Sequence, residues 1–174
     1  VEPYASLPLS GTAKLYASLI THTDKAIGRL IDYLEKNNLR ENTLIIFTSD
    51  NGGAVQAPLD ELNCNAGLRG RKALLYEGGI KVPFIVNFPG KIKPKQTRDN
   101  LIYFPDVMPT LAAFTGAKLP QHIDGISLKP LLSGKKQQTC KLILYWEFPG
   151  QQVAIRKGKW KAVSVNKSSE LELY

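Results

Sequence analysis

The sequence is poor in cysteine and histidine, with two residues of each in a chain of 174. Cys64 and Cys140 lie far apart, which fits neither a zinc-binding knuckle nor a dense disulfide framework. The pattern excludes a small fold held together by disulfides and leaves the disulfide state of both cysteines open. We expect His22, on a predicted helix, and His122, in a predicted loop, to be surface or capping residues.

Long apolar runs are also missing from the sequence. No stretch approaches the roughly 20 apolar residues that a membrane-spanning helix needs. The first residues lack the pattern of a signal peptide. We therefore expect no membrane span.

The chain has no excess of acidic residues; its formal net charge is +8 and its pI is near 9.5. The basic residues are spread along the chain with one cluster, residues 156–161, and they lack interleaved aromatic residues or a nucleic-acid-binding motif. We expect no nucleic-acid partner and regard an anionic glycan as the better candidate. An apolar content of 43% with 22% charged residues favours a folded chain with one core.

From about Thr12 to Asn38, apolar residues recur at three- and four-residue steps, which predicts an amphipathic helix. Asp24 lies on or near the apolar stripe, where an unpaired carboxylate would be costly. We expect Asp24 to be a hydrogen-bonded structural residue, with direct metal coordination as the alternative.

An apolar run from Thr43 to Thr48 predicts a strand covered on both faces in a parallel sheet, since polar residues do not alternate with apolar ones. A second strand is predicted at residues 82–88, and a short helix at residues 107–114 that ends near Gly116. Residues 141–147, 153–155 and 160–165 predict an antiparallel meander. We expect an α/β domain over residues 1–134 and a small antiparallel subdomain over residues 135–174, with the boundary near Lys135.

Ser49, Asp50, Asn51 and two glycines follow the first predicted strand directly. In open α/β sheets, ligands bind outside the carboxyl ends of strands. Asp50 and Asn51 offer hard oxygen donors of the kind that Ca²⁺ and Mg²⁺ prefer, and glycine lets the backbone approach a ligand. Taken alone, the same sequence is also a good turn.

Lys72 lies in the next loop, ahead of residues 76–83, which read YEGGIKVP. An ammonium group near a divalent cation predicts a site for an oxyanion ester, with Arg69 and Arg71 as competing cations. A lone loop lysine is otherwise solvated. We expect Glu77 and Lys81 to be structural and residues 78–79 to pack against the Asp50 loop.

These segments together resemble the sulfatase family, in which a strand ends in Asp-Asn-Gly and a lysine precedes a Tyr-Glu-Gly-Gly-x-Arg-x-Pro turn; Lys81 stands in the usual Arg position. The resemblance continues through residues 104–110 (FPDVMPT), 124–128 (DGISL), 153–156 and 158–161, so that it covers nearly the whole chain. The family's Cys/Ser-x-Pro/Ala-x-Arg nucleophile motif is absent, which makes the chain resemble the C-terminal part of a sulfatase.

The resemblance implies an α/β fold that is part of an alkaline-phosphatase-like sandwich with a mostly parallel sheet. It implies that Asp50 and Asn51 bind Ca²⁺, with Mg²⁺ as an alternative, and that Lys72 contacts the sulfate. The formylglycine nucleophile and the other metal ligands would belong to a missing N-terminal half, so the segment alone would be inactive. The substrate would be a sulfated small molecule or glycan, and the location, for a bacterial protein, periplasmic or secreted.

The residues themselves are also compatible with two other functions. A phosphatase, phosphodiesterase or phosphoethanolamine transferase of the same superfamily commonly uses two transition metals and an Asp-His pair, whereas this chain has Asp50 and Asn51; asparagine favours one hard cation. A non-catalytic glycan-binding module would use the glycine turns and the predicted basic hairpin. That hairpin could contact substrate or simply be solvated; its residues are Arg156, Lys159, Trp160 and Lys161.

Overall fold

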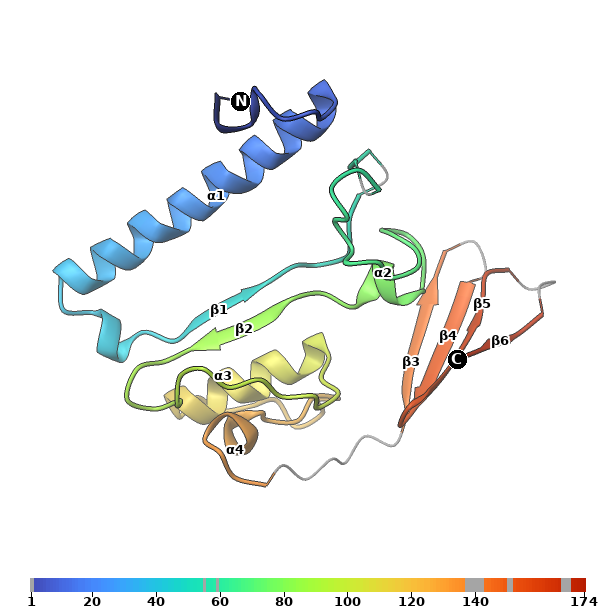
Figure 1. The fold of residues 1–174 in the computed structure, drawn as a ribbon. Helices are drawn as coiled ribbons and strands as arrows, with labels where there is room; N and C mark the ends of the chain where they lie inside the picture. Colours follow the sequence, from blue (N-terminus) through green and yellow to red (C-terminus); the bar gives the residue numbers. More distant parts are fainter. Residues whose placement is uncertain (1, 55, 59, 137–142, 150–151, 167–169) are drawn as a thin grey trace. The chain divides into compact units, whose positions relative to one another are not determined.

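The structure is a computed structural model that describes residues 2–54, 56–58, 60–136, 143–149, 152–166 and 170–174. It divides into two compact units, and Figure 1 shows the helices and strands of both. Unit 1 comprises Val1–Arg40, Ile46–Ile85 and Leu142–Tyr174, and unit 2 comprises Glu41–Ile45 and Val86–Lys141. The predicted boundary near Lys135 adjoins residues 137–142, outside the described residues, and stays a prediction.

The long N-terminal helix, α1, spans Gly11–Lys36 and confirms the predicted amphipathic helix to within two residues at each end. It begins where the Ser10 hydroxyl accepts a hydrogen bond from the Ala13 N–H, as N-cap side chains do. Among the elements of the described residues, α1 contacts only the short 3₁₀ helix η1 (Glu2–Tyr4). Several of its large apolar residues are exposed, with Leu15 62% accessible, although Ala13 is buried.

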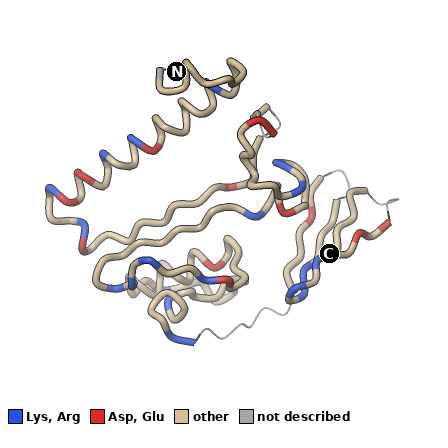
Figure 2. Tube along the Cα trace, viewed as in Figure 1, with Lys and Arg blue, Asp and Glu red and all other residues tan. Residues whose placement is uncertain are grey.

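Asp24 is exposed on α1 and forms no hydrogen bond or ion pair with another described residue. Neither the expected structural hydrogen bond nor metal coordination is therefore supported within the part of the chain that the structure describes. The expectation assumed a covered apolar stripe, which these residues do not provide for α1. Basic and acidic residues are interspersed along this helix (Figure 2), in keeping with a solvated polar face. No helix among the described residues is both long and apolar enough to cross a membrane.

Two short strands, β1 (Ile45–Thr48) and β2 (Phe84–Asn87), pair in a two-stranded sheet. Their arrows point in opposite directions in Figure 1, so this pair is antiparallel, whereas the apolar run had favoured a parallel neighbour. The chain returns beside itself because the segment before β2 bonds the segment after β1: the Gly52 N–H donates to the Gly79 carbonyl at 2.9 Å. Phe47 and Ile85 are exposed, so the described residues do not cover both faces.

The C-terminal strands confirm the predicted antiparallel meander. β3 (Leu144–Phe148), β4 (Gln152–Lys157), β5 (Trp160–Ser164) and β6 (Glu172–Leu173) form one sheet in the order β3-β4-β5-β6. Each neighbouring pair is antiparallel. The β4–β5 turn has two residues between the paired Lys157 and Trp160, and Gly158 supplies the positive φ of 58° that such a turn requires. Strand β6, only two residues long, was not predicted.

The core of unit 1 joins this sheet to the loop that carries the YEGG motif. Leu75 and Tyr76 are buried together with Ala154 of β4 and Val163 of β5. Partly buried apolar side chains surround this cluster; they are Leu74, Ile80, Trp146 and Val165. Hydrophobic burial of about 25 cal/mol per Å² of apolar surface therefore fixes the site loop on the meander.

Unit 2 contains η3 (Phe104–Asp106), α3 (Val107–Thr115) and α4 (Lys129–Leu132). Asp106 is buried, and its carboxylate accepts hydrogen bonds from the Ile126 N–H at 2.8 Å and the Tyr103 N–H at 3.2 Å. The Thr110 hydroxyl bridges the Asp106 carbonyl and the Leu128 N–H. These contacts give the FPDVMPT and DGISL segments a structural role. The predicted helix end is confirmed, since Gly116 adopts a left-handed φ of 77° after α3.

Candidate active-site loops

Asp50 and Asn51 follow β1 in a tight bend. The Ser49 hydroxyl donates to the Asn51 carbonyl at 2.9 Å, and the Asn51 amide nitrogen donates to the Gly52 carbonyl at 3.1 Å. Asp50 is exposed and Asn51 is half-buried. Because the amide nitrogen of Asn51 is occupied by the backbone, its oxygen is the atom left to face a ligand.

Three glycines let three backbone segments pack directly on one another. A Cβ on Gly52 would lie 1.7 Å from the Gly78 carbonyl oxygen, and one on Gly79 would lie 2.0 Å from the Leu74 carbonyl oxygen. The Gly78 N–H donates to the Arg69 carbonyl at 2.7 Å. The prediction that Gly78 and Gly79 pack against the Asp50 loop is confirmed, and no larger residue fits at these positions without moving backbone.

Lys72 lies beside the Asp50 loop through its backbone. Its N–H donates to the Gly53 carbonyl at 2.9 Å, two residues beyond Asn51, while its side chain is exposed. Ala73 follows with a φ of 72°, and the Gln152 side chain of β4 donates to its carbonyl at 2.9 Å. The structure thus brings together the segments of all three predicted site residues.

Asn65 is a further member of the site that the sequence did not reveal. Its Oδ1 accepts from the Gly53 N–H at 3.0 Å and its Nδ2 donates to the Gly70 carbonyl at 2.8 Å. A single amide therefore clamps the Asp50 loop to the Lys72 loop. Asparagine in a loop has many uses, so no local signal distinguishes this one.

The side-chain oxygens of the Asp50 loop are of the type that a hard divalent cation binds. One carboxylate and one amide oxygen suit Ca²⁺ or Mg²⁺, and neither side-chain oxygen is hydrogen-bonded to another described residue. A Ca²⁺ site takes about six to eight oxygens, which two side chains do not supply. Within the described ranges, no cluster of three or more His, Cys, Asp or Glu residues is placed to hold a metal.

Arg69 belongs to a stapling cluster formed by Arg69, Tyr76, Glu172 and Tyr174. The Arg69 guanidinium lies 4.0 Å from the Tyr76 ring centroid and 2.6 Å from a Glu172 carboxylate oxygen. The hydroxyls of Tyr76 and Tyr174 also donate to Glu172. With its charge and faces occupied, Arg69 is not a free competitor of Lys72.

Hydrogen bonding in the stapling cluster shifts two pKa values in opposite directions. Hydrogen bonds from Tyr174, Tyr76 and Arg69 lower the pKa of Glu172 to about 2. Donation to Glu172 and burial raise the pKa of Tyr76 to about 12. The lowered pKa of Glu172 and the raised pKa of Tyr76 widen the pH range over which Glu172 is ionised and Tyr76 neutral, the states in which their hydrogen bond forms.

Glu77 pairs with the C-terminal hairpin rather than only with its own turn. Its Oε1 lies 2.8 Å from the Lys161 ammonium nitrogen, and its Oε2 lies 3.6 Å from the Arg156 guanidinium. Lys161 is buried beneath the loop, with its side chain 5% exposed. The structural role expected for Glu77 is supported, and Lys161 and Arg156 are engaged internally.

Several other residues singled out in the sequence take no part in the contacts between the site loops. Lys159 and Trp160 are exposed on the hairpin, as are His22 and His122 elsewhere. Lys81 is exposed and forms no ion pair with another described residue, so the local pairing expected for it is not found.

The structure describes one of the two cysteines. Cys64 is a free thiol whose pKa is raised by burial. Cys140 lies outside the described residues.

The sequence matches the Sulfatase family model over residues 10–117 and the model described as N-sulphoglucosamine sulphohydrolase, C-terminal, over residues 70–174. It is 38% identical over 149 residues to a sulfatase of Formosa agariphila, covering 78% of this chain and 26% of the relative. It is 37% identical over 152 residues to human arylsulfatase A, covering 84% of this chain and 30% of that protein.

Solved structures agree in fold. The structure of Ps i-CgsB superposes with a TM-score of 0.83 at 29% identity over 99% of this chain and 38% of that one. BT4656, solved in complex with its substrate D-glucosamine-2-N,6-O-disulfate, gives a TM-score of 0.72 at 30% identity over 89% of this chain and 32% of that one. These neighbours confirm the predicted α/β fold class of the alkaline-phosphatase-like type.

The chain spans about a quarter to a third of the length of these curated relatives. Its matches nonetheless run through both site loops and the C-terminal meander. On this evidence, the chain belongs to the sulfatase family.

Proposed function

We propose that the chain is the C-terminal portion of a sulfatase that hydrolyses sulfate esters, with a sulfated carbohydrate as substrate. One observation carries the proposal: the Lys72 N–H donates to the Gly53 carbonyl at 2.9 Å. This bond holds a cationic side chain beside the loop that presents the oxygens of Asp50 and Asn51. Cationic and metal-binding groups side by side suit an ester with several anionic oxygens.

In this proposal, Asp50 and Asn51 supply two ligands of one Ca²⁺ ion, with Mg²⁺ as an alternative. When bound, such an ion neutralises charge on a sulfate ester and favours the ionised form of a hydroxyl nucleophile. Lys72 donates a hydrogen bond to a non-bridging sulfate oxygen and offsets charge on the leaving oxygen. The remaining ligands and the formylglycine nucleophile are proposed to come from an N-terminal half of the same enzyme.

Two structural neighbours favour carbohydrate as the substrate class. BT4656 was solved with a disulfated glucosamine, and Ps i-CgsB with a neocarrahexaose. Steryl-sulfatases are also relatives, at 40% identity over 130 residues for the rat enzyme, so a sulfated steroid is the competing substrate. Export to the periplasm or the medium stays a prediction.

The test uses the full-length protein of which the chain is proposed to be a part. We expect it to hydrolyse an aryl sulfate, to lose activity on calcium chelation and to regain it when calcium is restored. Lys72→Ala should lower kcat/KM by about 10²- to 10³-fold, the usual cost of removing one group that stabilises developing charge. Asp50→Ala should abolish calcium-dependent activity.

The matched control for Asp50→Ala is Asp99→Ala, an exposed acidic residue in a connection of unit 2. It should leave turnover unaltered. Hydrolysis of phosphate esters in place of sulfate esters would favour the phosphatase alternative. Calcium-independent glycan binding by the chain, without hydrolysis by the full-length protein, would favour a binding module.

A further inference from the structure

We propose that Arg71 and the pocket beside it form a binding site for a second anionic substituent, a sulfate or a carboxylate, on the sugar whose sulfate ester is held at Lys72. This inference rests on the proposed function and adds a determinant of substrate choice to it. Three features support such a site: the pocket, the ion pairs that neutralise other cations of unit 1, and the anchored backbone of Arg71.

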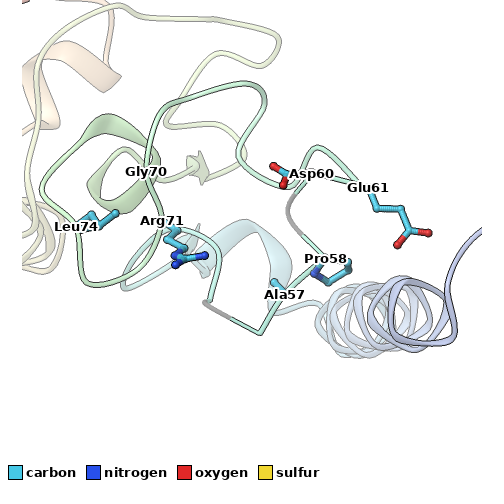
Figure 3. Close-up of a pocket in the computed structure, with 7 residues that line it drawn as sticks. All are labelled: Ala57, Pro58, Asp60, Glu61, Gly70, Arg71 and Leu74. Atoms are coloured by element: carbon cyan, nitrogen blue, oxygen red, sulfur yellow. The ribbon is translucent and has the colours of Figure 1, made fainter.

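The pocket lies within unit 1 and has a volume of about 550 Å³. Figure 3 shows the side chains that line it, with Arg71 directed toward the space between Leu74 and Ala57. Its seven lining residues are Ala57, Pro58, Asp60, Glu61, Gly70, Arg71 and Leu74. Small-molecule sites are typically pockets of about 300–1,000 Å³ with a few placed polar groups. Lys72 directly follows the lining residue Arg71 in the sequence.

Three cations of unit 1 are already neutralised by carboxylates of the chain. Arg69 is held by Glu172, and both Lys161 and Arg156 pair with Glu77. Arg71, in contrast, forms no ion pair or hydrogen bond through its guanidinium with another described residue. Arg71 and Lys72 are therefore the two cations of this loop whose charge is left for a ligand.

The backbone of Arg71 is fixed although its side chain is free. Its carbonyl accepts a hydrogen bond from the Leu74 N–H at 3.0 Å, and the N–H of the same peptide group, which belongs to Lys72, donates to the Gly53 carbonyl. A Cβ on Gly79 would lie 2.5 Å from the same Arg71 carbonyl, so the turn is packed tightly there. Consecutive Cα atoms are about 3.8 Å apart, so the two long cationic side chains start from one anchored turn, near enough for both to contact a single sugar unit.

The rest of the lining suits a sugar ring. Pro58, Ala57 and Leu74 offer apolar surface, while the exposed Asp60 can accept hydrogen bonds from hydroxyl groups. Glu61 is withdrawn from this role, because its carboxylate accepts from the Ser10 N–H and hydroxyl at 2.6 and 2.7 Å. In Figure 3 it points away from Arg71. Arginine presents a planar fork that binds sulfate or carboxylate through two parallel hydrogen bonds.

The test compares the full-length protein with its Arg71→Gln variant on four substrates: an aryl sulfate, a monosulfated glucosamine, a disulfated glucosamine and a sulfated uronic acid. We expect the unaltered protein to prefer a doubly anionic sugar over the monosulfated one. Arg71→Gln should lower that preference by about 10- to 100-fold, chiefly through KM, as expected for loss of charge-assisted hydrogen bonds. Arg71→Lys should restore part of it, because it keeps the charge without the fork.

The disulfated and uronic acid substrates tell which anion the site takes, and Arg98→Gln in an exposed loop of unit 2 is the matched control. Equal losses on all four substrates, a lowered melting temperature, or an unaltered preference would overturn the inference while leaving the proposed function standing. Absence of sulfate release from every substrate by the unaltered protein would overturn both.

Discussion

The ammonium group of Lys161 lies 2.8 Å from the carboxylate of Glu77, although the two residues are 84 positions apart. This ion pair fastens the YEGG turn to strand β5, and the Trp146 ring lies 5.6 Å from the same ammonium. A buried charge that loses its partner is costly, so the pair can be tested by removing one side at a time.

Glu77→Ala should lower the free energy of unfolding by about 3 kcal/mol, because Lys161 would stay buried without a counter-charge. Urea unfolding measures the change. Lys159→Met, at an exposed site on the same hairpin, should change it by less than about 0.5 kcal/mol. A double variant, Glu77→Leu with Lys161→Met, should recover much of the loss; if Glu77→Ala alone is neutral, the pair has no structural weight.

The stapling cluster predicts a specific response of stability to acid. The pKa of Glu172 is about 2 in the folded chain against an ordinary value of 4.5, so its contribution is complete above pH 4.5 and is lost as the pH falls toward 2. Glu172→Gln should therefore flatten the acid side of the stability profile. Chemical denaturation at several pH values measures this, with Glu170→Gln as the control.

The same cluster predicts a response to alkali. The pKa of Tyr76 is raised from 10 to about 12, so its contribution is present below pH 10 and is lost between pH 10 and 12. The hydrogen bond to Glu172 also raises the pKa of Tyr174, and burial raises that of Tyr145. Ultraviolet titration should therefore show Tyr76 as the last of several late tyrosines, and Tyr76→Phe should remove that last transition. An unaltered titration in Tyr76→Phe would contradict the assignment.

Two glycine-to-alanine changes should act in opposite directions. Gly52→Ala places a methyl group 1.7 Å from the Gly78 carbonyl oxygen and should destabilise the protein by about 2 kcal/mol or more. Gly28→Ala on α1 has open space and should stabilise it by about 0.5–1 kcal/mol, because alanine is the better helix former. Thermal unfolding compares them, and similar shifts of one sign would contradict the close packing of the site loops.

Ala73 holds a left-handed φ of 72° immediately after Lys72. Ala73→Gly should relieve about 1 kcal/mol of backbone strain, partly offset by the greater freedom of glycine in the unfolded chain. We expect an unaltered or slightly raised melting temperature. Ala17→Gly within α1 should instead lower stability by about 1 kcal/mol, and equal losses for both would argue against the left-handed turn.

Local patterns predicted local structure well. The periodic apolar residues located α1, and the helix that ends at Gly116 was placed to within one residue, since both signals lie within the elements themselves. The close approach of Gly52 to Gly78 followed from two glycine-rich turns in a recognised spacing. The metal and sulfate roles of Asp50, Asn51 and Lys72 stay predictions.

The supports of the site were not predictable from the sequence. Asn65 and Glu172 carry no local pattern that names their partners, because those partners are brought near only by the tertiary fold. The sequence placed Lys161 on a hairpin that either contacts substrate or is solvated, whereas the structure buries it against Glu77. Asp24 was expected to be hydrogen-bonded on a covered face of the helix, whereas large apolar residues of that helix are exposed among the described residues.

The contacts between the Lys72 loop and the C-terminal strands also bear on the order in which the chain folds. The contacts from Gln152 to Ala73, Lys161 to Glu77 and Tyr76 to Glu172 span 79, 84 and 96 positions. Closing the long intervening loops costs chain entropy before these contacts can form, so we expect them to form late in folding. A chain interrupted before Gln152 would keep every motif of the two loops but would lack these three anchoring contacts. The arrangement of the site loops therefore depends on the C-terminal strands, which are made after both loops.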